Sequence, residues 1–275
     1  MSGKQRAGLW VSRLIIWIAI IFTLFPASWI FMASLSKGQS FFSKTLFPKA
    51  LSLQNYKNLL EKTDFLNWVA NSLKLCFSVS VIQLFLTSTS AYAFSRMRFP
   101  GKKNGLLTLL VLQVFPSSMA VSGYYIIIYH FGLSDNLFAL ILVLAGGSAF
   151  NIWLLKSYID TIPKELDEAA YVAGANHFTV FTRIILPLAQ PQLAVIFIFS
   201  FIAAYSEFVI SSIFLNTPAN QTLAVGLQTF ITNQFATNWT LFAAAAVLSS
   251  LPVMIMFMFM QRYIQSGLAS AGVKG

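Results

Sequence analysis

Long uncharged apolar runs alternate with short polar segments along almost the whole chain. Five of these runs lie between Arg13 and Lys37, Lys74 and Arg96, Lys103 and His130, Asp135 and Lys156, and Arg183 and Glu207. A sixth run, about Trp239–Gln261, follows the polar stretch Asn216–Asn238. A helix needs about 20 apolar residues to cross the hydrocarbon core of a bilayer, so each run is long enough for one crossing. The pattern predicts an all-α, polytopic membrane protein with six transmembrane helices.

The composition changes this picture little and excludes several other classes of protein. Of the 275 residues, 57% are hydrophobic and 9% are charged, whereas a soluble domain carries about 25% charged residues. The net charge of +10 comes from small basic groups between the apolar runs, not from a basic patch with interleaved aromatics. Nucleic acid is therefore not an expected partner, whereas membrane lipid is. The single cysteine, Cys76, excludes an intramolecular disulfide and a CxxC metal site.

Lys and Arg residues set the expected orientation, because short cytoplasmic loops carry an excess of them. With the N-terminus inside, the inner segments hold Lys4, Arg6, Arg13, Arg96, Arg98, Lys102, Lys103, Lys156, Lys164, Arg183, Arg262 and Lys274. The outer lysines Lys37, Lys44, Lys49, Lys57 and Lys62 all lie in one longer segment, and Lys74 lies near the outer end of the second run. We therefore expect both termini to be cytoplasmic.

The same pattern divides the chain into three regions. Residues 1–66 hold the N-terminal end, the first helix and an external segment. Residues 67–264 form the main transmembrane domain, with a cytoplasmic loop at 162–187, and residues 265–275 form a cytoplasmic tail. Three of the expected spans contain an interior proline, Pro26, Pro116 and Pro252, and a cluster of small residues at 145–149 favours close packing of helices.

The loop between the fourth and fifth runs differs from the other connections. It contains four of the eight acidic residues, and Thr161 and Pro163 are helix-start signals. Helical spacing then puts a set of small apolar residues on one face: Leu166, Ala169, Ala170 and Ala173. Gly174 suits the end of this helix, and a second helix is expected at about Asn176–Ile185. The small-residue face predicts a partner protein, although a helix lying on lipid headgroups remains the alternative.

One motif in this loop resembles the EAA loop of ABC importer permeases. Its residues are Glu168, Ala169 and Ala170, then Gly174, and finally Ile184, Leu186 and Pro187. The resemblance implies a type I ABC importer permease fold, paired with a second, larger permease subunit and two copies of a cytoplasmic ABC ATPase. It also implies that the loop at 162–187, here named the coupling loop, enters a groove of the ATPase. In that arrangement Glu168 meets a basic residue of the ATPase.

Other segments are similar to the carbohydrate branch of that family, and best to the smaller permease subunits of maltose/maltodextrin importers. They include residues 53–60, then Phe65, Trp68, Asn71 and Ser72, and later residues 200–204, 222–226 and 242–246. The resemblance implies import of sugars, an extracytoplasmic sugar-binding protein and a place in a bacterial or archaeal cell membrane. It puts Thr232, Asn233 and Gln234 at the tip of a loop that reaches the binding protein. It also puts the tail, Gly272, Val273, Lys274 and Gly275, between the ATPase subunits.

The chain has no GxxxxGK[ST] nucleotide loop, so ATP and Mg are expected on the partner ATPase and no cofactor or enzymatic activity on this chain. A secondary transporter is the alternative class, but it would need carboxylates at mid-membrane and, commonly, internal repeats. An intramembrane enzyme would need a paired nucleophile and base, or a metal site. Glu207 is the only acid within the apolar part of the sequence. It is a candidate for a pore or gate residue, or for a wet position at the outer interface.

Overall fold

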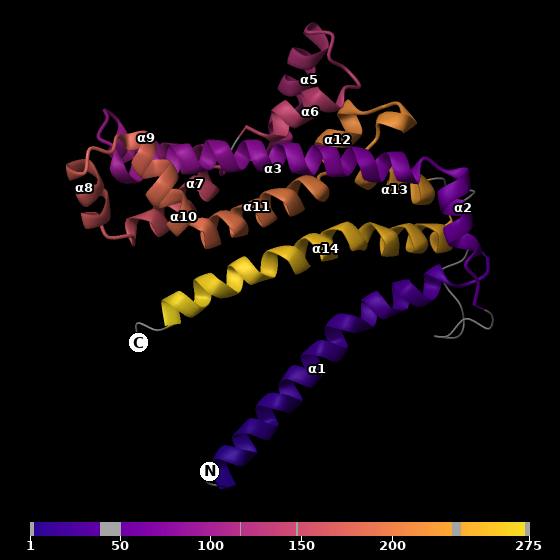
Figure 1. Cartoon of the computed structure of the whole chain (residues 1–275). Coiled ribbons are helices and arrows are strands. Elements are labelled where there is room, and N and C mark those ends of the chain that lie inside the picture. Colours follow the sequence, from indigo (N-terminus) through magenta and orange to yellow (C-terminus); the bar gives the residue numbers. More distant parts are fainter. Residues whose placement is uncertain (1–2, 39–50, 116, 147, 233–237, 273–275) are drawn as a thin grey trace. The chain divides into compact units, whose positions relative to one another are not determined.

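The computed structural model describes residues 3–38, 51–115, 117–146, 148–232 and 238–272, and in these ranges the chain is helical with no strand (Figure 1). The all-α prediction is therefore confirmed. Three helices are long: α1 (Gly3–Ser34), α3 (Phe65–Arg96) and α14 (Trp239–Gly272). The shorter ones are α2 (Gln54–Lys62), α4 (Lys102–Leu112), α5 (Val121–His130), α6 (Leu137–Leu144), α7 (Ala149–Asp160), α8 (Glu165–Val172), α9 (His177–Val180), α10 (Leu186–Leu188), α11 (Gln190–Tyr205), α12 (Val209–Phe214) and α13 (Leu223–Thr232).

Three single helices and two bent helix pairs are long and apolar enough to cross a bilayer. The single helices are Gly8–Ser34, Phe65–Arg96 and Trp239–Tyr263. One pair joins α6 to α7 with a bend of 50°, and the other joins His177–Leu188 to α11 with a bend of 79°. The expected span at 103–130 is instead divided between α4 and α5. Up to five crossings are thus present in the described residues, and six crossings and the orientation of the termini stay predictions.

The small-residue cluster at 145–149 coincides with a break between two helices. Helix α6 ends at Leu144, and α7 starts at Ala149. Ser148 lies in an extended conformation, and its hydroxyl accepts a hydrogen bond from the backbone N–H of Asn151. Glycine loses more conformational freedom in a helix than any other residue, and serine is a preferred N-cap, which accounts for the break. Pro26 and Pro252 lie inside α1 and α14, and Pro116 lies outside the described residues.

The chain separates into two compact units. The first unit takes its described residues from 1–66 and from Gly226–Leu251. Asn55 of α2 is buried there, and its amide donates to the backbone oxygens of Ser34 and Ser36 at 2.9 Å each. The hydroxyl groups of Tyr56 and Ser34 are 2.6 Å apart. These contacts attach α2 to the end of α1, so the Asn-Tyr pair within residues 53–60 has a structural role.

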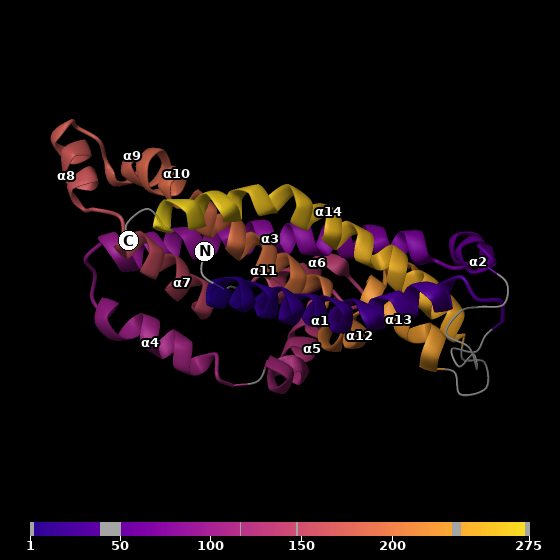
Figure 2. The same ribbon diagram turned by 90° about the horizontal axis from the view of Figure 1, so that it is seen from below.

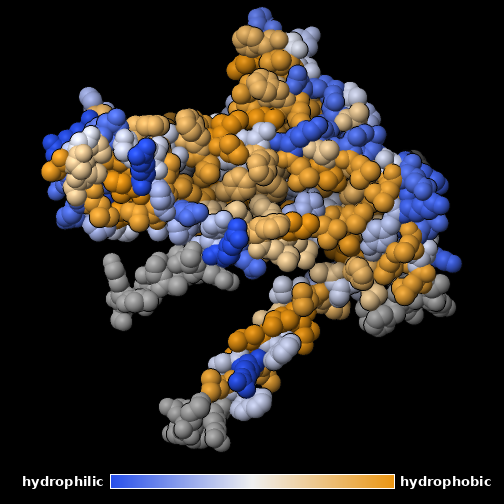
Figure 3. Space-filling model, viewed as in Figure 1, coloured by the Kyte–Doolittle hydropathy of each residue, from blue (hydrophilic) through white to orange (hydrophobic). Residues whose placement is uncertain are grey.

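The second unit comprises Asn67–Val225 and Pro252–Gly275, of which residues 67–272 are described apart from the gaps. Helix α11 runs beside α3, and α5 and α6 stand out from the side of α3 (Figures 1 and 2). One buried cluster joins α3, α6, α11 and α12 through residues such as Val79, Leu140 and Phe201. A second joins the Arg96 end of α3 to α7 and α9 through Tyr92, Ile159 and Val180. Apolar side chains cover the middle of this unit, and polar ones gather at its α8 end (Figure 3).

Three of the residues that resemble the carbohydrate branch hold a loop against α3. The indole N–H of Trp68 donates to the oxygen of Pro218 at 2.8 Å, and the amide of Asn71 donates to that of Ala219 at 2.8 Å. The Ser72 hydroxyl accepts from the backbone N–H of Leu223 at 2.7 Å. The backbone polar groups of a loop outside helices and strands need partners, and these side chains supply several of them. The three residues therefore stabilise the loop between α12 and α13.

Asp135 holds the other side of the same loop. Its carboxylate accepts hydrogen bonds from the backbone N–H groups of Asn216 and Thr217 and from the Asn220 amide, at 2.8, 3.1 and 2.9 Å. Burial opposes ionisation, but these hydrogen bonds outweigh it and lower the pKa of Asp135 below the ordinary value of 3.8. Its φ of 55° lies in the left-handed region, which Asp and Asn tolerate better than other non-glycine residues.

We expect Asp135→Asn to weaken this loop at neutral pH, because it removes the charge while keeping the turn. A lowered folded-state pKa means that the stabilisation is present above about pH 4 and is lost as the pH falls through the folded value. Thermal unfolding of the detergent-solubilised chain between pH 3 and 6 should therefore show a fall at low pH that the variant lacks. Parallel curves for the two proteins would contradict the assignment.

Candidate functional site

The coupling loop folds as a short helix, a glycine turn and a second short helix. Helix α8 starts at Glu165 with three acids in its first turn, where they complement the helix dipole. At its end the N–H of Gly174 donates to the oxygen of Tyr171, and the N–H of Ala175 donates to that of Ala170. With Gly174 at φ 86°, this is a Schellman motif, as the sequence predicts. Asn176 caps α9 by accepting a hydrogen bond from Thr179 N–H at 2.8 Å.

The outer side of this hairpin exposes several apolar side chains. Val172 is 92% exposed and Phe178 73%, and Leu166, Ala169 and Ala173 are exposed as well. We call these five residues the docking surface. Glu168 is exposed beside them. Ala170, expected on the same face, is half-buried and packs against the chain's own core near Tyr92 and Val180. Three of the four residues expected on this face are therefore exposed, and Val172 and Phe178 are exposed beside them.

The inner side of α8 carries a buried ion pair. The Asp167 carboxylate lies 2.6 Å from Nε of Arg96, the last residue of α3, and the two side chains are only 5% and 3% exposed. A second guanidinium nitrogen of Arg96 donates to the backbone oxygen of Ile162 at 2.7 Å. Buried charges occur in proteins when they are paired, and here each of these charges has the other. The pair attaches the coupling loop to the end of α3.

A second set of polar contacts lies one turn earlier on α3. The Tyr171 hydroxyl is 2.8 Å from Nδ1 of His177, and the Tyr92 hydroxyl donates to the backbone oxygen of His177 at 3.3 Å. The ring of Tyr92 also contacts that of Phe181, with centroids 5.0 Å apart. Tyr92 and Arg96 are four positions apart and so lie on the same face of α3. This face of α3 holds both helices of the hairpin.

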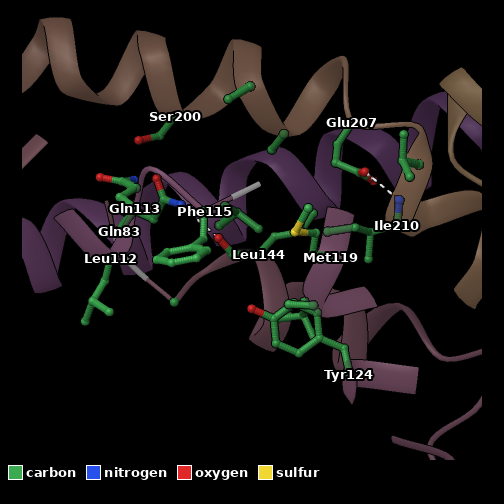
Figure 4. Close-up of a pocket in the computed structure, with 17 residues that line it drawn as sticks. Gln83, Leu112, Gln113, Phe115, Met119, Tyr124, Leu144, Ser200, Glu207 and Ile210 are labelled. Carbon is green, nitrogen blue, oxygen red and sulfur yellow. Dashed lines mark hydrogen bonds between the residues drawn. The ribbon is translucent and has the colours of Figure 1, made fainter. Parts of the chain in front are cut away.

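A cavity of ≈ 780 Å³ lies among α3, α4, α5, α6, α11 and α12 (Figure 4). Its lining is mostly apolar, with a few polar side chains: Gln83, Gln113, Tyr124, Ser200 and Glu207. Gln83 donates to the oxygen of Leu144 at 2.8 Å, and Gln113 accepts from the N–H of Phe150 at 3.0 Å. Mostly apolar walls with a few polar groups are typical of small-molecule sites. Among the described residues, no cluster of His, Cys, Asp or Glu is arranged to hold a metal ion.

Glu207 lies just after α11 and is partly exposed. Its carboxylate accepts hydrogen bonds from the N–H groups of Ile210 and Ser211 at 2.7 and 2.8 Å, and from the Ser211 hydroxyl at 2.5 Å. It therefore caps α12 and lines the cavity at the same time (Figure 4). The expected gating role stays a prediction.

We expect Glu207→Ala to destabilise the fold by about 0.5–2 kcal/mol, because it removes the acceptor for the first N–H groups of α12. Thermal unfolding in detergent measures the change. Ser206→Ala is the matched control, because the Ser206 hydroxyl donates to the backbone oxygens of Ile202 and Ala203 in α11, at 2.8 and 3.4 Å. Equal midpoints for the Glu207 and Ser206 variants would contradict the capping role.

The remaining candidate residues lie at or beyond the ends of the described ranges. Thr232 is the last residue of α13, and Asn233 and Gln234 lie outside the described residues. Gly272 is the last residue of α14, and Val273, Lys274 and Gly275 also lie outside. The loop tip and the tail therefore stay predictions.

A family model described as "Binding-protein-dependent transport system inner membrane component" matches residues 1–270. The chain belongs to this family. The match includes the coupling loop, the ion pair and the cavity, and it confirms the resemblance to ABC importer permeases. Since the family consists of membrane components of transport systems, this permease is a transport subunit and not an enzyme.

Three relatives of the permease are named for sugar transport. It is 38% identical to the maltodextrin transport system permease protein MdxG of Bacillus subtilis (strain 168) over 83% of each chain. It is 36% identical to the maltose/maltodextrin transport system permease protein MalG of Escherichia coli (strain K12), over 99% of this chain and 98% of the relative. It is also 35% identical to the galactooligosaccharides transport system permease protein GanQ of Bacillus subtilis (strain 168), over 100% and 99%.

One solved structure has the same fold. It is a chain of a bacterial ABC transporter involved in the import of the acidic polysaccharide alginate. The TM-score is 0.81 and the identity 25%, over 96% of this permease and 98% of that chain. The type I ABC permease fold expected from the EAA motif is therefore present.

Several residues of the site escape sequence reasoning. Asp167 looks like one more acid of a solvated helix start, and Arg96 like one more positive residue at the inner end of a span. Their pairing links positions far apart in the sequence, so no local pattern predicts it. One signal was available: Asp167, Ala170 and Tyr171 lie at i, i+3 and i+4, so helical spacing puts all three on one side of α8.

Proposed function

We propose that this permease is one membrane-spanning half of an ATP-driven importer of sugars, with maltose/maltodextrin as substrate. Its partners are a second, larger permease subunit, two copies of a cytoplasmic ABC ATPase and an extracytoplasmic sugar-binding protein. ATP and Mg bind to the ATPase. The chain crosses the cell membrane six times with both termini in the cytoplasm, and its cavity forms part of the translocation path.

The docking surface is the observation that carries this proposal. Large apolar side chains such as Val172 and Phe178 are seldom so exposed where a protein surface faces water. A contiguous patch of exposed apolar side chains marks a binding site. Acidic Glu168 and Glu165 lie on the same helix, which suits a groove with basic residues. The patch occurs in the EAA segment of a chain that has no nucleotide loop of its own. An ATPase therefore fits it better than a lipid headgroup surface, which favours Lys-rich helices.

The choice of sugar rests on the relatives and on the lining of the cavity. Gln83, Gln113 and Ser200 offer amide and hydroxyl groups that suit hydroxylated ligands, and Tyr124 offers an aromatic face. MdxG and MalG are named for maltodextrin, and GanQ for galactooligosaccharides. Maltodextrin is the substrate shared by two of the three.

Reconstitution tests the proposal directly. The permease is co-expressed with the permease, ATPase and binding protein of neighbouring reading frames, purified, and placed in proteoliposomes containing ATP. We expect uptake of labelled maltotriose that needs ATP and is unaffected by a protonophore. Uptake of galactooligosaccharide alone would overturn the maltodextrin assignment, and uptake driven by an ion gradient without ATP would overturn the ABC importer assignment.

The outer loop at Thr232–Gln234 is proposed to reach into the binding protein. Its Thr, Asn and Gln side chains donate and accept hydrogen bonds as sugar hydroxyls do. Deleting these three residues should abolish maltotriose uptake while ATPase co-purification and basal ATP hydrolysis stay at the level of the unmodified chain. Normal uptake by the deletion variant would contradict this role.

The C-terminal residues Gly272–Gly275 are proposed to enter the interface between the two ATPase subunits. They are too few and too polar to form a packed structure of their own. Their removal is expected to lower sugar-stimulated ATP hydrolysis and to leave insertion intact. Unchanged hydrolysis would identify them as an ordinary chain end.

A further inference from the structure

The contact between α8 and α3 is more specific than the attachment of a surface helix requires. Asp167 is the only residue of α8 that is fully buried, and the atom it meets belongs to the last residue of α3. Around it, Ser95 donates to Asp160 at 2.6 Å, and Lys156 pairs with the same carboxylate at 2.5 Å. The end of α3 is thus connected by charged groups to α7 as well as to α8.

A buried ion pair is an inefficient way to gain stability alone. Removing two charges from water is costly, and a well-packed apolar pair of the same volume often stabilises a protein as much or more. The planar guanidinium differs from an apolar side chain in that it fixes direction, because its N–H groups lie in a rigid fork. Here one N–H group of the fork donates to the backbone oxygen of Ile162, just before α8, and Nε lies 2.6 Å from the Asp167 carboxylate in an ion pair without hydrogen-bond geometry. The pair therefore fixes the orientation of α8 on α3.

Helix α3 continues from this pair to the cavity without a break. Gln83 and Val79 of the same helix line the cavity, and Gln83 lies 13 positions before Arg96, or about 20 Å along the axis. Gln83 also donates to the oxygen of Leu144, the residue at which α6 ends (Figure 4 shows both residues). A rigid element that touches two sites is a physical means of coupling them.

We propose that Arg96 and Asp167 are a positioning pair that makes α8 and α3 move together. A displacement of α8 at the docking surface is passed along α3 to the wall of the cavity at Gln83. The inference rests on the proposed function, because it assigns the route by which ATPase motion reaches the transported sugar. Tyr92 and Tyr171 strengthen the same connection through His177.

The test separates positioning from folding with two variants of the reconstituted complex. Asp167→Asn leaves Arg96 without its counter-ion, and the double variant Arg96→Met with Asp167→Leu replaces the pair by apolar side chains that a buried site tolerates. The readout is maltotriose uptake per ATP hydrolysed, together with ATPase co-purification. We expect the double variant to assemble normally and its uptake per ATP to fall by about 2- to 30-fold, the range for residues that transmit coupling. Arg98→Met, which changes an exposed arginine two positions beyond Arg96, is the control and should behave as the unmodified chain.

Several outcomes overturn the proposal. Unchanged maltotriose uptake per ATP in the double variant would mean that the ion pair only fills space. Loss of ATPase co-purification by that variant would mean that the pair only shapes the docking surface, and failure to accumulate in the membrane would assign it to folding. If Asp167→Asn does not accumulate in the membrane, the double variant alone tests the proposal, because it leaves no unpaired buried charge. Absence of a co-purifying ATPase with the unmodified chain is a different result, because it overturns the proposed function itself.

Discussion

Replacing Ala169 by tryptophan should prevent the ATPase from binding to the permease. Ala169 is exposed in the middle of the docking surface, between Leu166 and Val172 on α8. A large ring at this position holds the two proteins apart, and typical overpacking penalties of about 1–3 kcal/mol correspond to about 5- to 150-fold in affinity. Because the side chain has no place in the permease's own core, insertion and accumulation should be unaffected. Co-purification of the ATPase from solubilised membranes measures the loss.

Two matched alanine variants sharpen this experiment. Ala219→Trp places the same ring on an exposed alanine of the loop between α12 and α13, and it should leave ATPase binding unchanged. Ala170→Trp places it one residue further along α8, where the side chain packs against the internal cluster. That variant should lower the unfolding temperature of the permease itself. Full ATPase binding by the Ala169 variant would show that the docking surface serves another purpose.

Gly174→Val should redirect the second half of the coupling loop. Gly174 has φ 86°, and a Cβ added there meets no described heavy atom within 4 Å, so the penalty comes only from the backbone conformation. A left-handed conformation costs an ordinary residue about 1–2 kcal/mol, which lowers the population of the native turn by about 5- to 30-fold. Phe178, which follows the turn, would then leave the docking surface. We expect reduced ATPase co-purification and reduced uptake per complex.

Gly174→Asn is the control for this substitution. Asparagine adds a side chain of similar size but visits the left-handed region readily. It should therefore retain most of the ATPase binding. Equal behaviour of the Val and Asn variants would exclude the backbone conformation as the cause.

The sequence predicts elements whose signals are local. The Schellman turn at Gly174 and the start of the last helix at Trp239 follow from residue type and hydrophobic pattern, and the structure has both. The second long helix starts earlier than its charge-free run, since Lys74 lies exposed inside α3. A lysine near the end of a span extends its ammonium group to the interface, so one charge does not end a helix. The positions of charged residues thus locate the apolar spans but not the residues at which the helices begin and end.

The breaks and the tertiary contacts could not be predicted in this way. Hydropathy treats residues 103–130 and 135–156 as continuous, because a glycine or a capping serine is not polar enough to interrupt an apolar average. In the structure both segments are divided into two helices. The second is divided near Ser148, whose side chain caps the start of α7. In the same way, the burial of Asp167 and the outward position of Val172 depend on which face of α8 meets α3, and helical spacing alone leaves two neighbouring faces open.

The pairing of Arg96 with Asp167 also has a consequence for biosynthesis. The two residues are 71 positions apart, so a ribosome that adds about 5–20 residues per second completes Asp167 about 4–14 s after Arg96. During that interval the guanidinium has no internal counter-ion and stays hydrated at the membrane surface. In the proposed orientation it is then one of the positive charges that favour a cytoplasmic position for the end of α3. With that orientation, the same arginine serves as a topology signal in the nascent chain and as the attachment of the coupling loop in the folded one.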